Sequence, residues 1–309
     1  MEFVIPVPDN RYYLWQMLVQ AAHFREMGYE DDAHYLVIYF GQPSDILQRI
    51  FDSDALGCYI HAYPDTREDH GYSASMKPWL LGQYFNQFPK QAGRVHNYLD
   101  PDVMFTHPMD FTPFEQYDGR WYGSDTRSYT GAQYIREKGE QLFLDLCEIA
   151  GVSPDLVLEH DHNSIGAQYF IKDAEADFWF NVERHSVKAY HHMIATRDKY
   201  QPEGHQYPIQ AWCAEMYMQQ YQTIKAGFTP VADERLQFHW ANHNAADWDE
   251  RACFHNAGVA AENGRDFCKI TWQTSPFRKE ITVSPESASS RYVDLIRKTE
   301  VMFPDLIWE

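Results

Sequence analysis

The chain has 309 residues, of which 44% are hydrophobic and 16% aromatic, so it can bury a substantial globular core. Its 45 acidic and 26 basic residues give a formal net charge of -19. This charge opposes diffuse binding to nucleic acid or to an anionic membrane, because such binding depends on Lys and Arg side chains that neutralise phosphates.

The cysteines and the apolar segments indicate a cytoplasmic protein. The five cysteines are scattered and include no C-x-x-C pair, so the sequence predicts neither a disulfide framework nor a thiolate zinc site. No basic segment followed by an apolar one opens the chain. No apolar run approaches the roughly 18 residues that span a bilayer. We therefore expect reduced thiols and no contact with a membrane.

Strands alternate with helices among the predicted elements of the first hundred residues. Apolar runs predict strands at 3–7, 34–40, 58–64 and 93–100, and the segments between them predict helices at 11–27, 42–51 and 76–88. Asp9 or Asn10 can cap the first helix, and Gly28 stands where a C-terminal glycine belongs. Strands separated by helices of this length predict a mostly parallel sheet, which binds ligands beyond the carboxyl ends of its strands.

The second half of the chain is less regular. We expect strands at 119–125 and 236–241, helices at 139–151, 177–198, 210–225 and 289–302, and a loop with Pro202, Gly204 and Pro208. No internal repeat is present. The sequence therefore predicts a single α/β domain with a Rossmann-type, mostly parallel central sheet flanked by helices. A nucleotide-binding half would end at about residue 105, and an acceptor-binding half would follow from about residue 106 to residue 309.

Two carboxylates flank a proline in the stretch YLDPDVMF, which begins at Tyr98. On an extended backbone Asp100 and Asp102 would point to the same side, where their charges repel unless a cation lies between them. Carboxylate oxygens suit Mg²⁺ or Mn²⁺, and such a cation can neutralise a pyrophosphate leaving group. Short acidic pairs also occur in solvated turns, but the apolar residues on both sides favour a metal site here.

Clustered histidines support a rival hypothesis, a zinc hydrolase. Imidazole and carboxylate ligands would come from the HDH and HWANH segments, through His160, Asp161, His162 and His239. No H-E-x-x-H motif exists, and hydrogen-bonded surface or core histidines explain most of the fifteen. His255 is different, because it lies in a short apolar strand from which one imidazole can face a metal.

Several uncharged or isolated polar residues are candidates for a ligand pocket. Gly166 lets the backbone approach a ligand closely, with Ser164 and Gln168 as neighbouring hydrogen-bonding groups, and the alternative is a tight turn into an amphipathic helix. Glu215 lies among apolar residues on a predicted helix, where a carboxylate either faces solvent or lines a pocket with a shifted pKa.

Further candidates for the ligand pocket are a lysine, an aspartate and several tryptophans. Lys77, before Pro78, can offset phosphate charge, and Asp125 stands at the end of a predicted strand. Flat aromatic faces can also stack on sugars, although core packing explains most of the tryptophans considered, which are Trp79, Trp121, Trp212 and Trp240.

Five segments resemble, in the same order, the plant and algal peptidyl-serine alpha-galactosyltransferases and hydroxyproline arabinosyltransferases. They are KPW at 77–79, YLDPDVMF at 98–105, IGAQYFIKDAEADFWFNV at 165–182, IQAWCAEMYMQQYQTIKAGF at 209–228 and CFHNAGV at 253–259. The resemblance implies a GT-A glycosyltransferase fold and a UDP-sugar donor. It also implies a Mn²⁺ or Mg²⁺ ion and transfer with retention at the anomeric carbon.

The same resemblance implies roles for individual residues. Asp100 and Asp102 would be the D-x-D metal ligands, and His255 the later one. Gly166, Ala167 and Gln168 would belong to the donor and acceptor pocket, and Glu215 would be the catalytic carboxylate near the reacting sugar. The residues themselves, apart from the resemblance, add Lys77, Ser164 and Trp212 as expected donor contacts and Asp125 as a second catalytic candidate.

The leading hypothesis is therefore a metal-dependent glycosyltransferase that moves a sugar, with arabinose or galactose favoured, from UDP to a hydroxyl acceptor. The acceptor class is open and includes a protein, a glycan, a small molecule or a hydroxymethylated base in viral DNA, although the acidic net charge counts against DNA. The alternatives are the histidine-based zinc hydrolase and a non-catalytic carbohydrate-binding protein built on the aromatic side chains.

Overall fold

The computed structural model of the chain describes residues 1–116, 118–200 and 208–308. The α-helices are α1 (Arg11–Met27), α2 (Asp45–Phe51), α3 (Met76–Gln87), α4 (Thr112–Glu115), α5 (Arg127–Thr130), α6 (Ala132–Lys138), α7 (Glu140–Ala150), α8 (Pro154–Glu159), α9 (Ala176–Ala195), α10 (Ala214–Lys225) and α11 (Ser289–Met302). The strands are β1 (Glu2–Pro8), β2 (Ala33–Tyr39), β3 (Tyr59–Pro64), β4 (His96–Leu99), β5 (Val103–Phe105), β6 (Arg120–Asp125), β7 (Ile165–Ile171), β8 (Thr229–Ala232), β9 (Phe238–Trp240) and β10 (Cys253–His255).

The strands confirm the predicted α/β class. Seven of them form one sheet in the order β3-β2-β1-β4-β7-β6-β8, and three form a second sheet in the order β5-β10-β9. In the larger sheet β1 pairs with β2, β2 with β3, and β6 with β8 in parallel, whereas β6 and β7 are antiparallel. The protein is therefore a mixed α/β fold with a mostly parallel central sheet flanked by helices.

The contacts along the chain divide it into two compact units that interleave in sequence. The N-terminal unit contains residues 1–65, 99–111 and 235–309, and the central unit contains residues 66–98 and 112–234. Among the described helices, none is both long enough and apolar enough to cross a bilayer.

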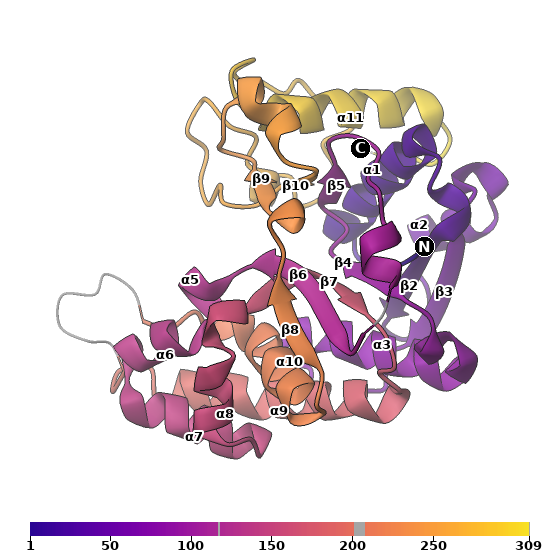
Figure 1. Cartoon of the computed structure of the whole chain (residues 1–309). Helices are drawn as coiled ribbons and strands as arrows, with labels where there is room; N and C mark the ends of the chain where they lie inside the picture. The colour runs from indigo at the N-terminus through magenta and orange to yellow at the C-terminus, as the bar shows by residue number, and fades with distance from the viewer. Residues whose placement is uncertain (117, 201–207, 309) are drawn as a thin grey trace. The chain divides into compact units, whose positions relative to one another are not determined.

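The N-terminal unit is built on β1, β2 and β3, the small sheet, and the helices α1, α2 and α11 (Figure 1). The Asn10 side chain caps α1 by accepting a hydrogen bond from the Tyr13 N–H, and Gly28 ends the helix in a left-handed conformation with φ of 74°. Both signals were expected from the sequence and are confirmed. The core of this unit includes the stacked rings of Phe24 and Phe105, which lie close to Phe3.

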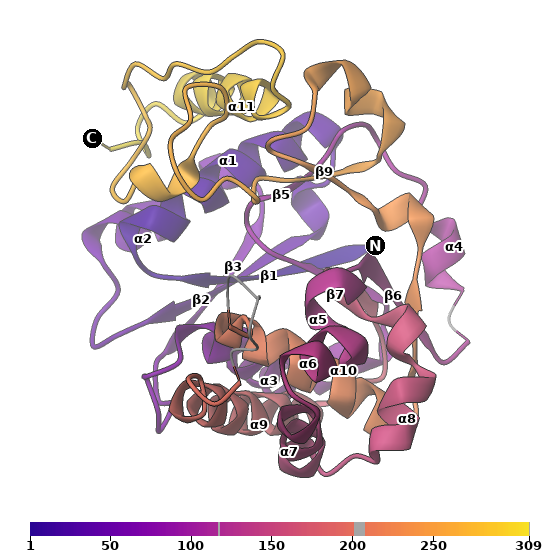
Figure 2. The same cartoon turned by 90° about the vertical axis from the view of Figure 1, so that its left-hand side faces the viewer.

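In the central unit α9 packs against both α3 and α10 (Figure 2). Strands β7, β6 and β8 of the large sheet belong to this unit. Trp121 of β6 is fully buried and stacks on Trp179 of α9 and on Phe228. The sequence left open whether Trp121 packs in the core or stacks on a sugar, and the structure shows core packing.

Several element bounds differ from those expected. The helix expected from residue 42 begins at Asp45, because Ser44 caps it by accepting a hydrogen bond from the Leu47 N–H. Residues 165–171, for which a turn into a helix was one alternative, form the strand β7. A loop was predicted at Pro202, Gly204 and Pro208, and the first two of these residues lie outside the described residues.

A buried histidine makes the stability of the N-terminal unit depend on pH. His23 on α1 accepts a hydrogen bond at Nε2 from the Phe105 N–H, and burial lowers its pKa from 6.5 to about 4. The unfolded chain therefore binds a proton at a pH where folded His23 does not, and the free energy of unfolding falls as the pH drops from 6.5 towards 4. We expect His23 to contribute a loss of about 2 kcal/mol between pH 7 and pH 5.

Urea unfolding of His23→Gln at both pH values checks this expectation. Gln keeps a hydrogen-bond acceptor but does not titrate, so the variant should lose less stability between the two pH values than the parent chain does. The exposed His107→Gln variant serves as the control and should follow the parent chain. Equal losses in His23→Gln and the parent chain would contradict the role of His23.

Candidate functional site

Three predicted metal ligands converge in the N-terminal unit. Asp100 directly follows β4, Asp102 directly precedes β5, and His255 ends β10. One ligand atom from each lies within 4.8 Å of the others, and these three residues form the one such group of His, Cys, Asp or Glu among the residues that the structure describes. The structure thus brings together, from segments about 150 residues apart, the ligand set that the sequence predicts.

Local hydrogen bonds explain how the acidic pair is held. The backbone from Pro101 to Asp102 forms a turn rather than the extended strand assumed from the sequence, and the Val103 N–H donates to the Asp100 carbonyl oxygen at 3.1 Å. Gln20 of α1 donates from Nε2 to the carbonyl oxygens of Asp100 and Val103, at 2.9 and 2.8 Å. A turn, not strand alternation, therefore brings the two carboxylates to one place.

Strand pairing places the histidine next to this turn. β10 is antiparallel to β5, with His255 opposite Val103, and the Asn256 N–H donates to the Asp102 carbonyl oxygen at 3.0 Å. His255 Nε2 lies 3.5 Å from Asp102 Oδ2. The buried Nδ1 atom of His255 has no hydrogen-bond partner among the described residues.

This donor set fits a divalent cation. Two carboxylates and one imidazole are hard or intermediate ligands that suit Mn²⁺ or Mg²⁺, and no thiolate is among them. Asp102 is only 3% exposed, so its charge needs a nearby cation. The residues that would hold the metal are therefore Asp100, Asp102 and His255.

A lysine that the sequence analysis missed already contacts this site. Lys269, in a short 3-10 helix (Lys269–Thr271), places its Nζ atom against Asp102 Oδ2. Burial by itself would raise the pKa of Asp102, but the positive charge of Lys269, and then that of His255, outweighs it and holds the pKa below its usual range. Asp102 is therefore ionised at neutral pH, and Lys269 supplies one positive charge beside it.

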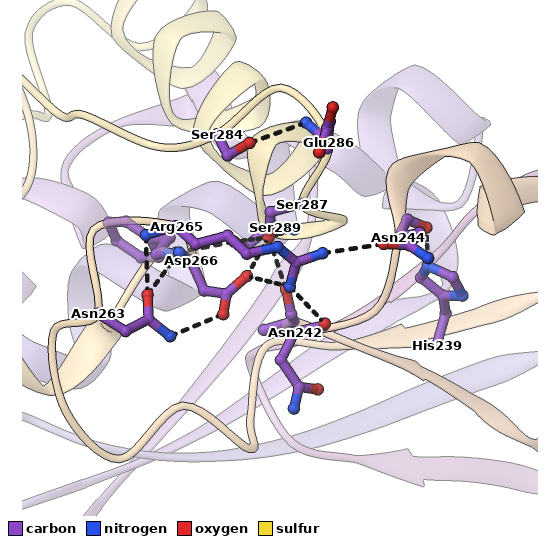
Figure 3. A network of polar contacts seen from close by, with 12 residues as sticks. His239, Asn242, Asn244, Asn263, Arg265, Asp266, Ser284, Glu286, Ser287 and Ser289 are labelled. Carbon is purple, nitrogen blue, oxygen red and sulfur yellow. Dashed lines mark hydrogen bonds and ion pairs between the residues drawn. The ribbon is translucent and has the colours of Figure 1, made fainter.

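A polar network holds the irregular loop that carries Lys269 (Figure 3). Arg265 donates to the Asn242 carbonyl oxygen and to Asn244 Oδ1, both at 2.9 Å. Asp266 is buried and accepts hydrogen bonds from Asn263 Nδ2 at 2.8 Å and from Ser287 Oγ at 2.6 Å. These bonds connect the segment before Lys269 to the loop after β9 and to the start of α11.

The remaining predicted residues lie in the central unit, where Tyr72 connects several of them. The Tyr72 hydroxyl donates to the Trp212 carbonyl oxygen at 2.6 Å and accepts from the Glu215 N–H at 2.9 Å. Glu215 Oε1 accepts a hydrogen bond from the Tyr98 hydroxyl at 3.1 Å. Burial raises the pKa of Cys213, the Glu215 carboxylate raises it further, and the nearby Lys77 lowers it.

These contacts decide two questions that the sequence left open. Glu215 does not face solvent, because only 3% of it is exposed. The Trp212 side chain is 62% exposed, unlike those of Trp79 and Trp121, which belong to the core. Of these three tryptophans of the central unit, Trp212 is therefore the one whose ring is available to a ligand.

The predicted glycine segment forms a distorted strand. β7 changes its register against β6 between Gly123 and Ser124, and Ala167 adopts a left-handed φ of 61°. Gln168 is fully buried and donates to Ser124 Oγ at 3.1 Å. A non-glycine residue in this conformation is strained, and such strain is concentrated at functional sites.

Two glycines around this distortion should respond differently to substitution. A Cβ atom at Gly123 would lie 2.7 Å from the Gln168 carbonyl oxygen, which cannot move without the strand. At Gly166 the nearest atom, at 2.1 Å, is Cε of the flexible Met216 side chain. We expect Gly123→Ala to lower the free energy of unfolding by about 1–3 kcal/mol, and Gly166→Ala to lower it less. Chemical denaturation of both variants measures the difference, and an equal or reversed order would contradict this account.

The other two predicted side chains have local partners. Asp125 is exposed, and its Oδ1 atom accepts a hydrogen bond from the Arg127 N–H at 2.8 Å, as in a polar turn. Ser164 is buried and donates to the Asp161 carbonyl oxygen at 2.9 Å. Both side chains are thus held by local hydrogen bonds at the ends of β6 and β7.

The histidine alternative gains no support from the described chain. His160, Asp161 and His162 are not members of any group of three or more ligands found in the described residues. His239 Nε2 is 3.0 Å from the Asn244 carbonyl oxygen, which explains this histidine as a hydrogen-bonded core residue.

Comparison with known proteins found similar structures. No protein-family model and no curated protein sequence matches the chain. The apo structure of the bifunctional glycosyltransferase WbbM aligns with 96% of this chain at 9% identity and a TM-score of 0.49, and the alignment spans about half (49%) of the WbbM chain. The structure of the galactosyltransferase LgtC with donor and acceptor sugar analogs aligns over 96% of this chain and 95% of its own, at 14% identity and a TM-score of 0.46.

Proposed function

We propose that the protein is a metal-dependent glycosyltransferase that moves a sugar from a UDP-sugar to a hydroxyl acceptor. The observation that supports this proposal most directly is the convergence of Asp100, Asp102 and His255, because a nucleotide-sugar transferase needs positive charge next to its diphosphate leaving group. The sequence resemblance to retaining galactosyl- and arabinosyltransferases supports the donor class and the retention of configuration.

The reaction follows from the charges at this site. A divalent cation held by the three ligands would stabilise the negative charge on the departing UDP. The Lys269 ammonium, which contacts the same Asp102 carboxylate, adds a fixed positive charge beside that place. The bond between the anomeric carbon and the diphosphate oxygen breaks, the acceptor oxygen bonds to the anomeric carbon, and the proton of the acceptor hydroxyl passes to an oxygen of the departing UDP.

Glu215 is proposed to stabilise the positive charge that develops on the sugar ring. Its carboxylate is buried and bonded to Tyr98, so its orientation is restricted. Glu215→Gln keeps the hydrogen bond from Tyr98 but removes the charge, and we expect kcat to fall about 100-fold with little change in donor KM. Steady-state kinetics with a saturating donor measure the effect, and Tyr98→Phe serves as the control for the hydrogen bond. Near-normal turnover with unchanged donor binding would rule out this role.

A donor screen tests the proposed function. UDP-arabinose, UDP-galactose, UDP-glucose and UDP-xylose are each incubated with the protein in Mn²⁺ and in EDTA, and both melting temperature and UDP release are measured. We expect one donor to stabilise the protein and to release UDP slowly in Mn²⁺ only, with UDP-arabinose or UDP-galactose favoured. Proton NMR of the released or transferred sugar then reports the anomeric configuration.

The outcomes separate the alternatives. Absence of a response to every donor would overturn the proposal. A response to Zn²⁺ alone would favour the hydrolase, and glycan binding that survives Asp102→Ala without donor consumption would favour a carbohydrate-binding protein.

A further inference from the structure

The N-terminal unit contains a cavity that shares no residue with the candidate metal site. It has a volume of about 660 Å³ and is lined by residues of α1, the end of β5, a 3-10 helix (Ala245–Glu250) and α11. α1 packs against both α11 and β5, as Figure 2 shows. The volume lies within the range of cavities that hold small molecules.

Part of the lining is apolar. Met27, Phe105 and Leu295 contribute aliphatic and aromatic carbon, and the partly buried Trp248 contributes an indole ring. Such a surface favours a ligand with a planar, apolar body.

The lining also carries charged side chains, with basic ones in the majority. It contains three basic side chains and the two acidic ones of Glu26 and Asp294. Lys298 pairs with Glu26 at 2.9 Å, and Arg297 pairs with Glu300 at 2.7 Å. Arg291 has no ion pair or side-chain hydrogen bond with any residue that the structure describes. Its guanidinium is therefore available to an anion, and its planar donors match a carboxylate or sulfonate.

His23 adds a second donor to the same lining. Because its Nε2 atom accepts from the Phe105 N–H, the ring proton is on Nδ1 in the neutral form. That Nδ1 atom is buried and has no hydrogen-bond partner among the described residues. Arg291 and His23 thus both offer donors, whereas Asp294, the carboxylate of the lining that is outside an ion pair among the described residues, is exposed to solvent.

We propose that this cavity binds a small organic anion with a flat apolar body and one carboxylate or sulfonate group. The apolar side chains and Trp248 contact the body of the ligand, and Arg291 pairs with its acidic group. The proposal does not depend on the glycosyltransferase activity, because none of its residues belongs to the metal site.

Two fluorescent probes of similar shape test this proposal. 8-Anilino-1-naphthalenesulfonate has an aromatic body with a sulfonate, and N-phenyl-1-naphthylamine has the same body without it. We expect the sulfonate probe to bind the folded protein at one site and at least about tenfold more tightly than the neutral probe. Fluorescence titration gives the affinities, and isothermal titration calorimetry gives the stoichiometry.

Three variants connect the binding to this cavity. Arg291→Gln should weaken the sulfonate probe about tenfold and leave the neutral probe unchanged. Leu295→Trp should fill the cavity and abolish binding of both probes, and Trp248→Ala should weaken both if Leu295→Trp does not fold. The exposed Arg278→Gln, outside the cavity, is the matched control and should change nothing. Equal affinity for the two probes, several binding sites or full binding by Arg291→Gln would overturn the proposal.

Discussion

Asp102→Asn is expected to reduce metal-dependent release of UDP from the donor by about 100- to 1,000-fold. The substitution keeps the size of the side chain but removes the negative charge that attracts the cation, and stabilisation of the leaving group depends on that cation. Asp102 is also the residue that Lys269 and His255 both approach, so its carboxylate is the centre of the site. Initial rates of UDP release with saturating donor and Mn²⁺ measure the loss.

The matched control is Asp249→Asn, which changes the net charge by the same amount at an exposed position. It should keep the activity of the parent chain. Manganese binding, followed by electron paramagnetic resonance, should weaken in Asp102→Asn and remain unchanged in the control. Retained activity in a folded Asp102→Asn variant would remove the metal site from the proposed function.

Lys269→Met should destabilise the protein in the absence of metal, and Mn²⁺ should restore much of the loss. Asp102 is almost completely buried, so removal of the Lys269 ammonium leaves a carboxylate without its main counter-charge. We expect a loss of about 2–4 kcal/mol in the free energy of unfolding, less than for a fully buried pair because Lys269 is partly exposed. A bound cation replaces the missing charge and stabilises the folded state by mass action.

Urea unfolding with EDTA and with millimolar Mn²⁺ measures both effects. Lys279→Met, at an exposed position of the N-terminal unit, is the control and should show a small loss that Mn²⁺ does not change selectively. If Lys269→Met is as stable as the parent chain in EDTA, the pair with Asp102 contributes nothing to folding. If the loss occurs but Mn²⁺ does not reverse it, the cation does not bind next to Asp102.

The sequence predicted the elements that carry their own signals. The bounds of α1 and α11 agree with expectation, because a cap and a terminal glycine mark α1 and a periodic apolar pattern marks α11. The three residues of the candidate metal site could also be selected from the sequence, since a D-x-D pair beside a strand and a histidine in a short apolar run are visible there, and the structure brings them together. The structure adds the turn that brings Asp100 and Asp102 together.

Features that depend on tertiary packing were not predicted. β7 is interrupted by Gly166 and by the left-handed Ala167, which disturb the alternation by which a strand is recognised. Lys269 lies in an irregular segment and contacts an aspartate 167 residues earlier, and no local pattern indicates such a partner. The D-x-D pair could therefore be recognised in the sequence, but the Lys269 ammonium that contacts it could not.

The two units alternate along the chain, and this affects how the amino-acid sequence can change during evolution. All three candidate metal ligands and Lys269 belong to the N-terminal unit, whereas residues 112–234 form one continuous insertion between β5 and β9. Substitutions, and even changes of length, can accumulate in that insertion without altering the pairing of His255 with Val103. The sequence around the candidate metal ligands and the sequence of the central unit can therefore change at different rates.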